Sequence, residues 1–111
     1  MNLKESIKSR MKEFLFLCSS HKVKTIYAFG SSVNDNFNEK SSDIDLLIDL
    51  EYDDPVEKGT NLLNIWDELE IFFDRKVDLL TYNSIKNPIL KKNIDSSKIL
   101  IYDGRNQKIS I

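Results

Sequence analysis

Two short apolar segments flank a long polar stretch in the first half of this 111-residue chain, and they restrict the possible folds strongly. Residues 25–29 are rich in β-branched and aromatic side chains and end at Gly30-Ser31, which is typical of a buried strand. Residues 31–42 are almost wholly polar, and we expect a short helical turn or loop there. Residues 43–50 regain strand character. The pattern predicts two strands joined by a polar connection.

The second predicted strand begins with two carboxylates. Alternate residues of a strand share a face, so Asp43 and Asp45 lie on one side and Ile44 and Leu46 on the other. Mg²⁺ prefers few protein carboxylates and completes its octahedron with water and phosphate oxygens. Asp43 and Asp45 therefore form a candidate magnesium site.

Asp78 is a third candidate ligand. It lies inside the otherwise apolar segment 77–80, where burying an unpaired charge would be costly. Two magnesium ions would need at least one carboxylate beyond the first two, and a neighbouring strand could supply it. The sequence thus predicts a metal site built from Asp43, Asp45 and Asp78.

Gly30 and Ser31 are the candidate phosphate-binding residues. A glycine after a strand lets a ligand approach the backbone closely, and the amides and hydroxyl of a following serine can hold phosphate oxygens. A Gly-Ser pair alone carries little information. Its weight comes from its place after one strand and shortly before Asp-x-Asp on the next.

The remaining segments predict one α+β domain, a small sheet covered by helices, over residues 1–104. Apolar residues at helical spacing predict a first helix, and Asp54-Pro55 can start a second, although Gly59 places its start alternatively near Thr60. These two helices are predicted over residues 3–18 and 55–74. The other predicted elements are a strand over 76–81, a helix over 85–94 interrupted at Pro88, a strand over 98–102 and a loose tail over 105–111.

Composition excludes several functional classes. The 16 Lys and Arg against 18 Asp and Glu give a net charge of −2, which argues against long nucleic acid as the main partner. One cysteine and one histidine exclude a cysteine-rich zinc site and a Ser-His-Asp triad. No apolar run approaches the ~20 residues of a membrane span. We expect a cytoplasmic protein.

Taken together, Gly30-Ser31, Asp43-x-Asp45 and Asp78 resemble the signature of the nucleotidyltransferase superfamily related to DNA polymerase β, in particular its minimal nucleotidyltransferases. The resemblance covers roughly residues 25–102. This chain departs from the family pattern in two places. Eleven residues lie between Ser31 and Asp43, one more than is usual, and Asn34-Asp35 stands where a basic residue followed by glycine is common. Lys40 is a possible substitute for that cation.

The resemblance implies a nucleotidyltransferase fold and transfer of a nucleoside monophosphate from a nucleoside triphosphate, here ATP, to a hydroxyl. It implies that Asp43 and Asp45 bind both Mg²⁺ ions, that Asp78 joins one ion and helps to deprotonate the hydroxyl, and that Gly30 and Ser31 hold the triphosphate.

Many small relatives resemble antitoxins that transfer AMP to a tyrosine of a HEPN-domain RNase toxin, which makes such a toxin the expected partner. Three further possibilities stay open at this point. The chain could neutralise a partner by binding alone, it could modify a small molecule, or it could form a homo-oligomer through an exposed apolar patch on the first helix or the tail.

Overall fold

The computed structural model describes residues 3–30, 43–106 and 108–110. Its centre is a five-stranded sheet in the order β3-β2-β1-β4-β5. β2 and β3 are parallel and the other neighbouring pairs are antiparallel, so the predicted α+β fold with a mixed sheet is confirmed. The strands are β1 (Val23–Phe29), β2 (Ile44–Leu50), β3 (Val77–Leu80), β4 (Ile99–Asp103) and β5 (Lys108–Ile109).

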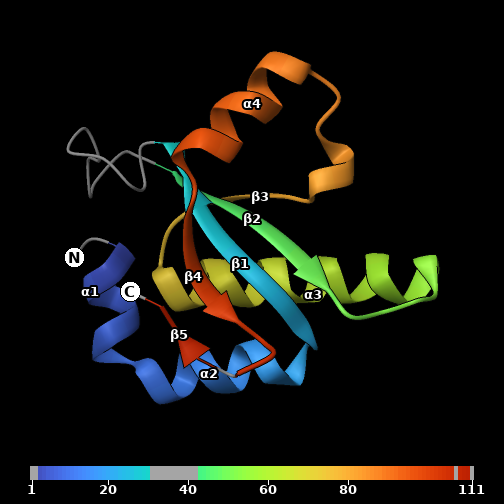
Figure 1. Ribbon diagram of the computed structural model, residues 1–111. Helices are drawn as coiled ribbons and strands as arrows, with labels where there is room; N and C mark the ends of the chain where they lie inside the picture. The colour runs from blue at the N-terminus through green and yellow to red at the C-terminus, as the bar shows by residue number, and fades with distance from the viewer. Residues whose placement is uncertain (1–2, 31–42, 107, 111) are drawn as a thin grey trace.

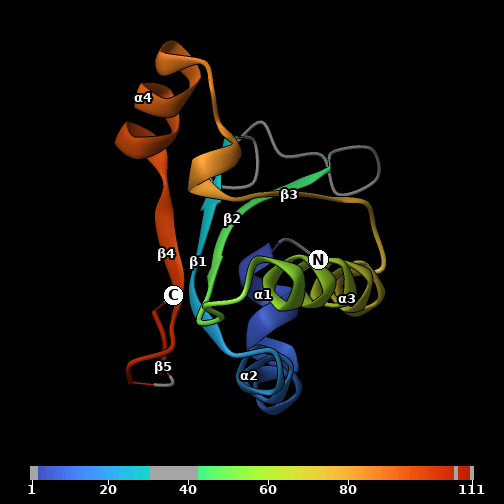
Figure 2. The same ribbon diagram turned by 90° about the vertical axis from the view of Figure 1, so that its right-hand side faces the viewer.

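The helices cover the two faces of the sheet unequally. The three helices α1, α2 and α3 lie on one face, whereas α4 stands at one end of the sheet, away from them (Figures 1 and 2). Within the described ranges, no helix has the length and apolarity needed to cross a membrane. The helices are α1 (Leu3–Ser9), α2 (Met11–Ser20), α3 (Pro55–Phe73) and α4 (Pro88–Ser97), with a 3₁₀ turn, η2, at Tyr82–Ser84.

Alternation along the strands divides the apolar side chains between two cores. Ile26 and Ala28 of β1 belong to the core formed with α1, α2 and α3, which we call the helical-face core. Phe29 and the partly buried Tyr27 belong to a smaller core on the opposite face, which we call the open-face core. The buried members of the open-face core are Phe29, Leu47, Ile85 and Ile94.

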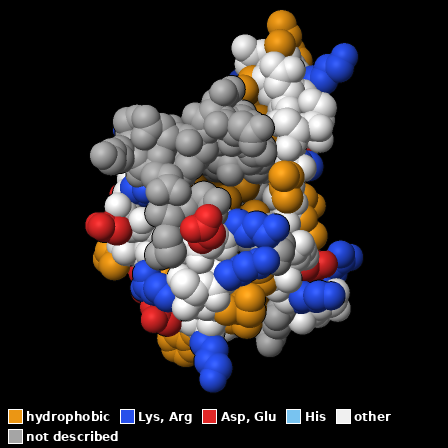
Figure 3. All heavy atoms as spheres, turned by 90° about the vertical axis from the view of Figure 1, so that its left-hand side faces the viewer, with side chains coloured by type: hydrophobic (Ala, Val, Ile, Leu, Met, Phe, Trp, Pro, Cys, Tyr) orange, Lys and Arg blue, Asp and Glu red, His pale blue; other side chains and the backbone are white. Residues whose placement is uncertain are grey.

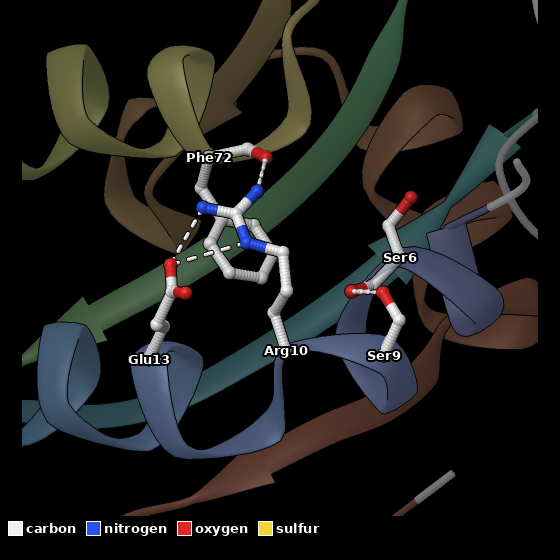
Figure 4. A network of polar contacts seen from close by, with 5 residues as sticks. All are labelled: Ser6, Ser9, Arg10, Glu13 and Phe72. Carbon is white, nitrogen blue, oxygen red and sulfur yellow. Dashed lines mark hydrogen bonds and ion pairs between the residues drawn. The ribbon is translucent and has the colours of Figure 1, made fainter.

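The predicted first helix, residues 3–18, is wrong in one respect, because the chain breaks at Arg10 into α1 and α2. Arg10 has φ −134° and ψ 45°, outside the helical region. Its guanidinium donates to the carbonyl oxygen of Phe72 at 2.7 Å and to Glu13, and it lies 4.3 Å from the centroid of the Phe72 ring (Figure 4). The last carbonyls of a helix have no partner within it. The break therefore lets Arg10 satisfy the end of α3.

α3 begins at Pro55, as Asp54-Pro55 predicts, and the alternative start near Thr60 is wrong. The carboxylate of Asp54 accepts a hydrogen bond from the amide of Glu57 at 3.4 Å. Gly59 is accommodated inside the helix, where its cost of roughly 1 kcal/mol relative to alanine is offset by the packing of the rest of α3.

The predicted helix over residues 85–94 is displaced. α4 begins at Pro88, and Asn87 caps it by accepting from the amides of Ile89 and Leu90 at 2.9 and 3.3 Å. Proline is well suited to the first helical position, because the amide it lacks would have no partner there. Pro88 is therefore the start of this helix and does not interrupt it.

The predicted loose tail, residues 105–111, differs from the structure at β5. Ile109 pairs with Tyr102 and Lys108 with Asp103 of β4. The turn before β5 is held by Arg105, whose guanidinium and amide donate to the carboxylate of Asp103. These hydrogen bonds hold the pKa of Asp103 below its ordinary value.

The edge strand β3 is covered by side chains of α3. Trp66 Nε1 donates to the carbonyl of Val77 at 2.7 Å, and the amide of Val77 donates to Glu70 at 2.9 Å. Covering the backbone groups of an edge strand blocks unwanted pairing with other strands. Trp66 thus contributes to the fold by capping this edge.

Candidate active site

Gly30 directly follows β1, whose last residue, Phe29, pairs with Asp45 near the start of β2. It has φ +63°, a conformation that residues with side chains rarely adopt. A Cβ at this position would lie 2.6 Å from Oδ2 of Asp45. Both conditions require glycine, and they bring the backbone of Gly30 directly against a predicted site carboxylate.

Asp45 and Asp78 meet on the open face. They are register partners in the parallel pair β2 and β3, and both side chains are half-buried. The pKa of Asp45 is raised to about 6, first by burial, then by the charge and hydrogen bond of Asp78, and last by the charge of Asp43. The structure therefore joins two of the three predicted carboxylates in direct contact.

Asp43 immediately precedes β2 and is half-buried. It acts on Asp45 through its charge. Among the residues that the structure describes, no group of three or more His, Cys, Asp and Glu side chains is placed to hold a metal ion. Ser31, the loop expected over residues 31–42 and the possible cation Lys40 lie outside the described residues.

The donor set at Asp45 and Asp78 fits a hard divalent cation. Both groups are oxygen donors, and their ionised forms repel one another in a partly dry site. A Mg²⁺ ion bound with few protein carboxylates and substrate phosphates would relieve this repulsion.

A groove of about 600 Å³ begins beyond these carboxylates on β2. Leu47, two residues after Asp45, lines it together with Ile48 and Asp49. Its other walls come from four separate parts of the chain: the N-terminal half of α3, the turn that follows β3, the middle of β1 and the residue before β4. Those lining residues are Pro55, Lys58, Gly59, Leu62, Thr81, Tyr82, Asn83, Thr25, Tyr27 and Lys98.

A polar cluster fixes one wall of this groove. Tyr82 donates to Asp95 at 3.0 Å, and Lys98 donates to the same carboxylate at 3.0 Å. Lys98 also lies 4.6 Å from the ring centroid of Tyr27, and Lys91 lies 4.1 Å from that of Tyr82. The sequence analysis missed this wall, since its members come from η2, α4 and β1 and share no motif.

On the face turned toward the viewer in Figure 3, basic side chains lie among apolar and acidic ones and form no continuous basic patch.

Comparison with known proteins gives consistent results. Residues 12–107 match the family model described as polymerase beta, nucleotidyltransferase. A "putative protein adenylyltransferase" of Methanocaldococcus jannaschii is 39% identical over 99 residues, which cover 89% of this chain and 94% of the relative.

Two solved structures share the fold. One is described as a "putative minimal nucleotidyltransferase", with a TM-score of 0.68 and 24% identity over 89% of this chain and 95% of that one. The other is a toxin–antitoxin with AMP-PNP, with a TM-score of 0.62 and 19% identity over 86% of this chain and 76% of that one. At these identities the likeness shows a common fold.

Proposed function

Because the chain belongs to the polymerase β nucleotidyltransferase family, we propose that it transfers AMP from ATP to a protein hydroxyl, a tyrosine of a HEPN-type RNase toxin, and acts as the antitoxin. The observation that carries this proposal is the contact of Gly30 with Asp45 and of Asp45 with Asp78. It places a backbone position that has no side chain directly beside paired carboxylates. The relative named as a protein adenylyltransferase supports a protein acceptor, and the toxin–antitoxin neighbour bound to AMP-PNP agrees with the choice of partner and nucleotide.

Each site residue has a distinct role in this proposal. Asp43, Asp45 and Asp78 would hold Mg²⁺, which supplies positive charge for the phosphates and lowers the cost of charge development during transfer. The backbone of Gly30, together with the hydroxyl and amide of Ser31, would hold the triphosphate.

The transfer step balances as follows. The acceptor oxygen forms a bond to the α-phosphorus, and the bond between that phosphorus and the oxygen leading to the β-phosphate breaks. Pyrophosphate leaves with the electron pair. The acceptor's proton passes to the carboxylate of Asp78, which lies beside Asp45 in the sheet. Positioning and charge neutralisation provide most of the rate enhancement in such reactions.

The test uses the full chain, ATP labelled at the α-phosphate, Mg²⁺ and a HEPN-type RNase encoded beside it. We expect the label on a tyrosine of the RNase, located by mass spectrometry, and loss of RNase activity. Asp45→Asn should reduce transfer by ~10³-fold or more, since it removes a charge that the transition state requires. Asp67→Asn, an exposed change on α3, is the matched control and should transfer normally.

The competing function is neutralisation by binding alone. If Asp45→Asn still silenced the RNase as well as the unmodified protein does, transfer would not be the mechanism. If the label appeared neither on a protein nor in free AMP formed by hydrolysis, nucleotidyl transfer itself would be contradicted.

A further inference from the structure

A hollow of about 440 Å³ lies between α2 and α3, on the side of the sheet that these helices cover. Phe16 of α2 and Ile71 of α3 both line it, and 74% and 76% of their surfaces are exposed. We call this surface the α2–α3 face. Its residues are Arg10, Glu13, Phe16, Leu17, Ser20, Glu68, Ile71 and Phe72.

The exposure of Phe16 and Ile71 follows from their positions in the two helices. Phe14 and Cys18 of α2 are buried in the helical-face core, and Phe16 lies two residues from each of them. Residues two apart in a helix point to different sides, so Phe16 points away from that core. Ile71 is likewise two residues from the buried Leu69 of α3. Both side chains therefore stay uncovered within one chain.

Polar side chains surround the apolar centre of the α2–α3 face. Arg10 and Glu13 lie at the start of α2, where the Arg10 guanidinium also donates to the carbonyl of Phe72 (Figure 4). Glu68 forms an ion pair with His21, which directly follows the end of α2. An apolar centre within a polar rim, with an aromatic side chain and an arginine, is the usual composition of a protein–protein interface.

The apolar area of the α2–α3 face is sufficient for a small dimer. Because a large aromatic side chain has about 150–250 Å² to bury, Phe16 and Ile71 together expose roughly 300 Å² in each copy. Two copies that covered these side chains would bury twice that area. Since roughly 60% of an interface is apolar, the whole interface would reach about 1,000 Å², near the lower limit for specific association. Such an area predicts a weak, reversible dimer.

The charges of the α2–α3 face complement those of a second copy. The start of α2 is positive, because Arg10 and Lys12 outweigh Glu13, and Lys12 lies on the same side of the helix as Phe16. Glu68 makes the region at the end of α2 negative. A two-fold axis near Phe16 and perpendicular to α2 runs the two α2 helices antiparallel. It therefore places the positive region of each copy against Glu68 of the other.

We propose that the α2–α3 face binds a second copy of this chain and forms a two-fold symmetric dimer, in which Phe16 of each copy enters the hollow of the other. A two-fold interface uses the same surface on both copies, so the assembly closes at two chains. Asp45 and Asp78 lie on the opposite, open face of the sheet, and both candidate active sites of the dimer stay accessible. This inference goes beyond the proposed function and does not depend on it.

Sedimentation equilibrium of the full chain, from micromolar to millimolar concentrations, tests the proposal. We expect the mass to rise with concentration to that of two chains and no further. Phe16→Glu should raise the Kd of the dimer at least tenfold. Ile89→Glu changes a similarly exposed apolar residue of α4 and should change the Kd less than twofold. A chain that stays monomeric throughout, or equal effects of the two variants, would overturn the proposal.

A pair of charge variants tests the two-fold arrangement. Glu68→Lys should raise the Kd of the dimer at least fivefold, because it places a lysine against Arg10 of the second copy. Asp67→Lys makes the same charge change at the neighbouring exposed residue of α3, outside the α2–α3 face, and should change the Kd less than twofold. Equal effects would show that only net charge matters, and the antiparallel arrangement would then be wrong.

A different protein is the alternative occupant of this face. If the unmodified chain stays monomeric while Phe16→Glu weakens binding of the HEPN-type RNase, the face belongs to that protein and the dimer proposal fails. A monomeric Phe16→Glu protein that transfers AMP as the parent does would support the proposal, because the face lies away from the candidate active site. A parent that dimerises but transfers no AMP would refute only the proposed function.

Discussion

The two faces of the sheet differ in role: one is packed by helices and stabilises the fold, and the other carries the candidate active site. The helical face is closed by α1, α2 and α3, and side chains such as Ile65 and Leu69 have no exposed surface there. The open face has a small core, and beside that core lie two carboxylates that repel one another and a groove. A mixed sheet with one well-packed face can tolerate unfavourable charges on the other face. The comparison teaches that the site depends on a stability that the opposite face provides.

The strongest test of this division compares one core side chain from each face. Leu69→Ala should destabilise the protein by about 2–5 kcal/mol, because it leaves a cavity in the fully buried helical-face core. Ile94→Ala, in the small open-face core, should fall at or below the lower end of that range. Chemical denaturation followed by circular dichroism measures both. Equal losses in the free energy of unfolding would show that the two faces contribute equally to stability.

A change at Gly30 tests how tightly the open-face site is built. Gly30→Ala should cost about 1–3 kcal/mol, since alanine at φ +63° is strained and its Cβ would displace the Asp45 carboxylate. ATP binding, measured by calorimetry, should weaken with it. A variant with unchanged stability and unchanged ATP affinity would show that the close contact between Gly30 and Asp45 is not needed.

The charge of Asp45 should lower stability at neutral pH. Its folded pKa of about 6 lies above the unfolded value of 3.8, so the folded state binds more protons between these values and stability falls as pH rises from about 4 to 6. Asp45→Asn should therefore stabilise the metal-free protein at pH 7, by about 1 kcal/mol after allowance for screening by water.

Thermal unfolding at several pH values measures this effect. The gain in stability from Asp45→Asn should disappear below pH 4, where the Asp45 carboxyl is protonated in both the folded and the unfolded protein. Mg²⁺ should raise the Tm of the unmodified protein more than that of the variant. A variant less stable than the parent at pH 7 would show that Asp45 supports the fold.

The smallest expected effect is at Gly59 in α3. A Cβ there would meet nothing within 4 Å, so Gly59→Ala should stabilise the protein by about 0.5–1 kcal/mol through higher helix propensity. Thermal unfolding would detect the gain as a raised Tm. The opposite signs expected at Gly59 and Gly30 distinguish a glycine that the helix tolerates from one that the site requires.

The elements that the sequence predicted incorrectly have tertiary causes. The break at Arg10 follows from its contact with Phe72, 62 residues away in the sequence. β5 forms because β4 offers a free edge, and two residues are too few to show a periodic pattern. The displaced start of α4 at Pro88 has a local cause instead, because Asn87 before it is a helix-capping residue that is visible in the sequence.

The sequence by itself determined the local order of the chain. Strand alternation, helix caps and the spacing of Gly30, Asp45 and Asp78 follow from backbone geometry and side-chain type, and the sequence carries both. Only the tertiary structure decided that Asp45 and Asp78 share a register, that Gly30 touches Asp45, and that β2 continues beyond the end of its pairing with β3. Pairing between distant segments depends on the burial of the whole sheet, and no local pattern encodes it.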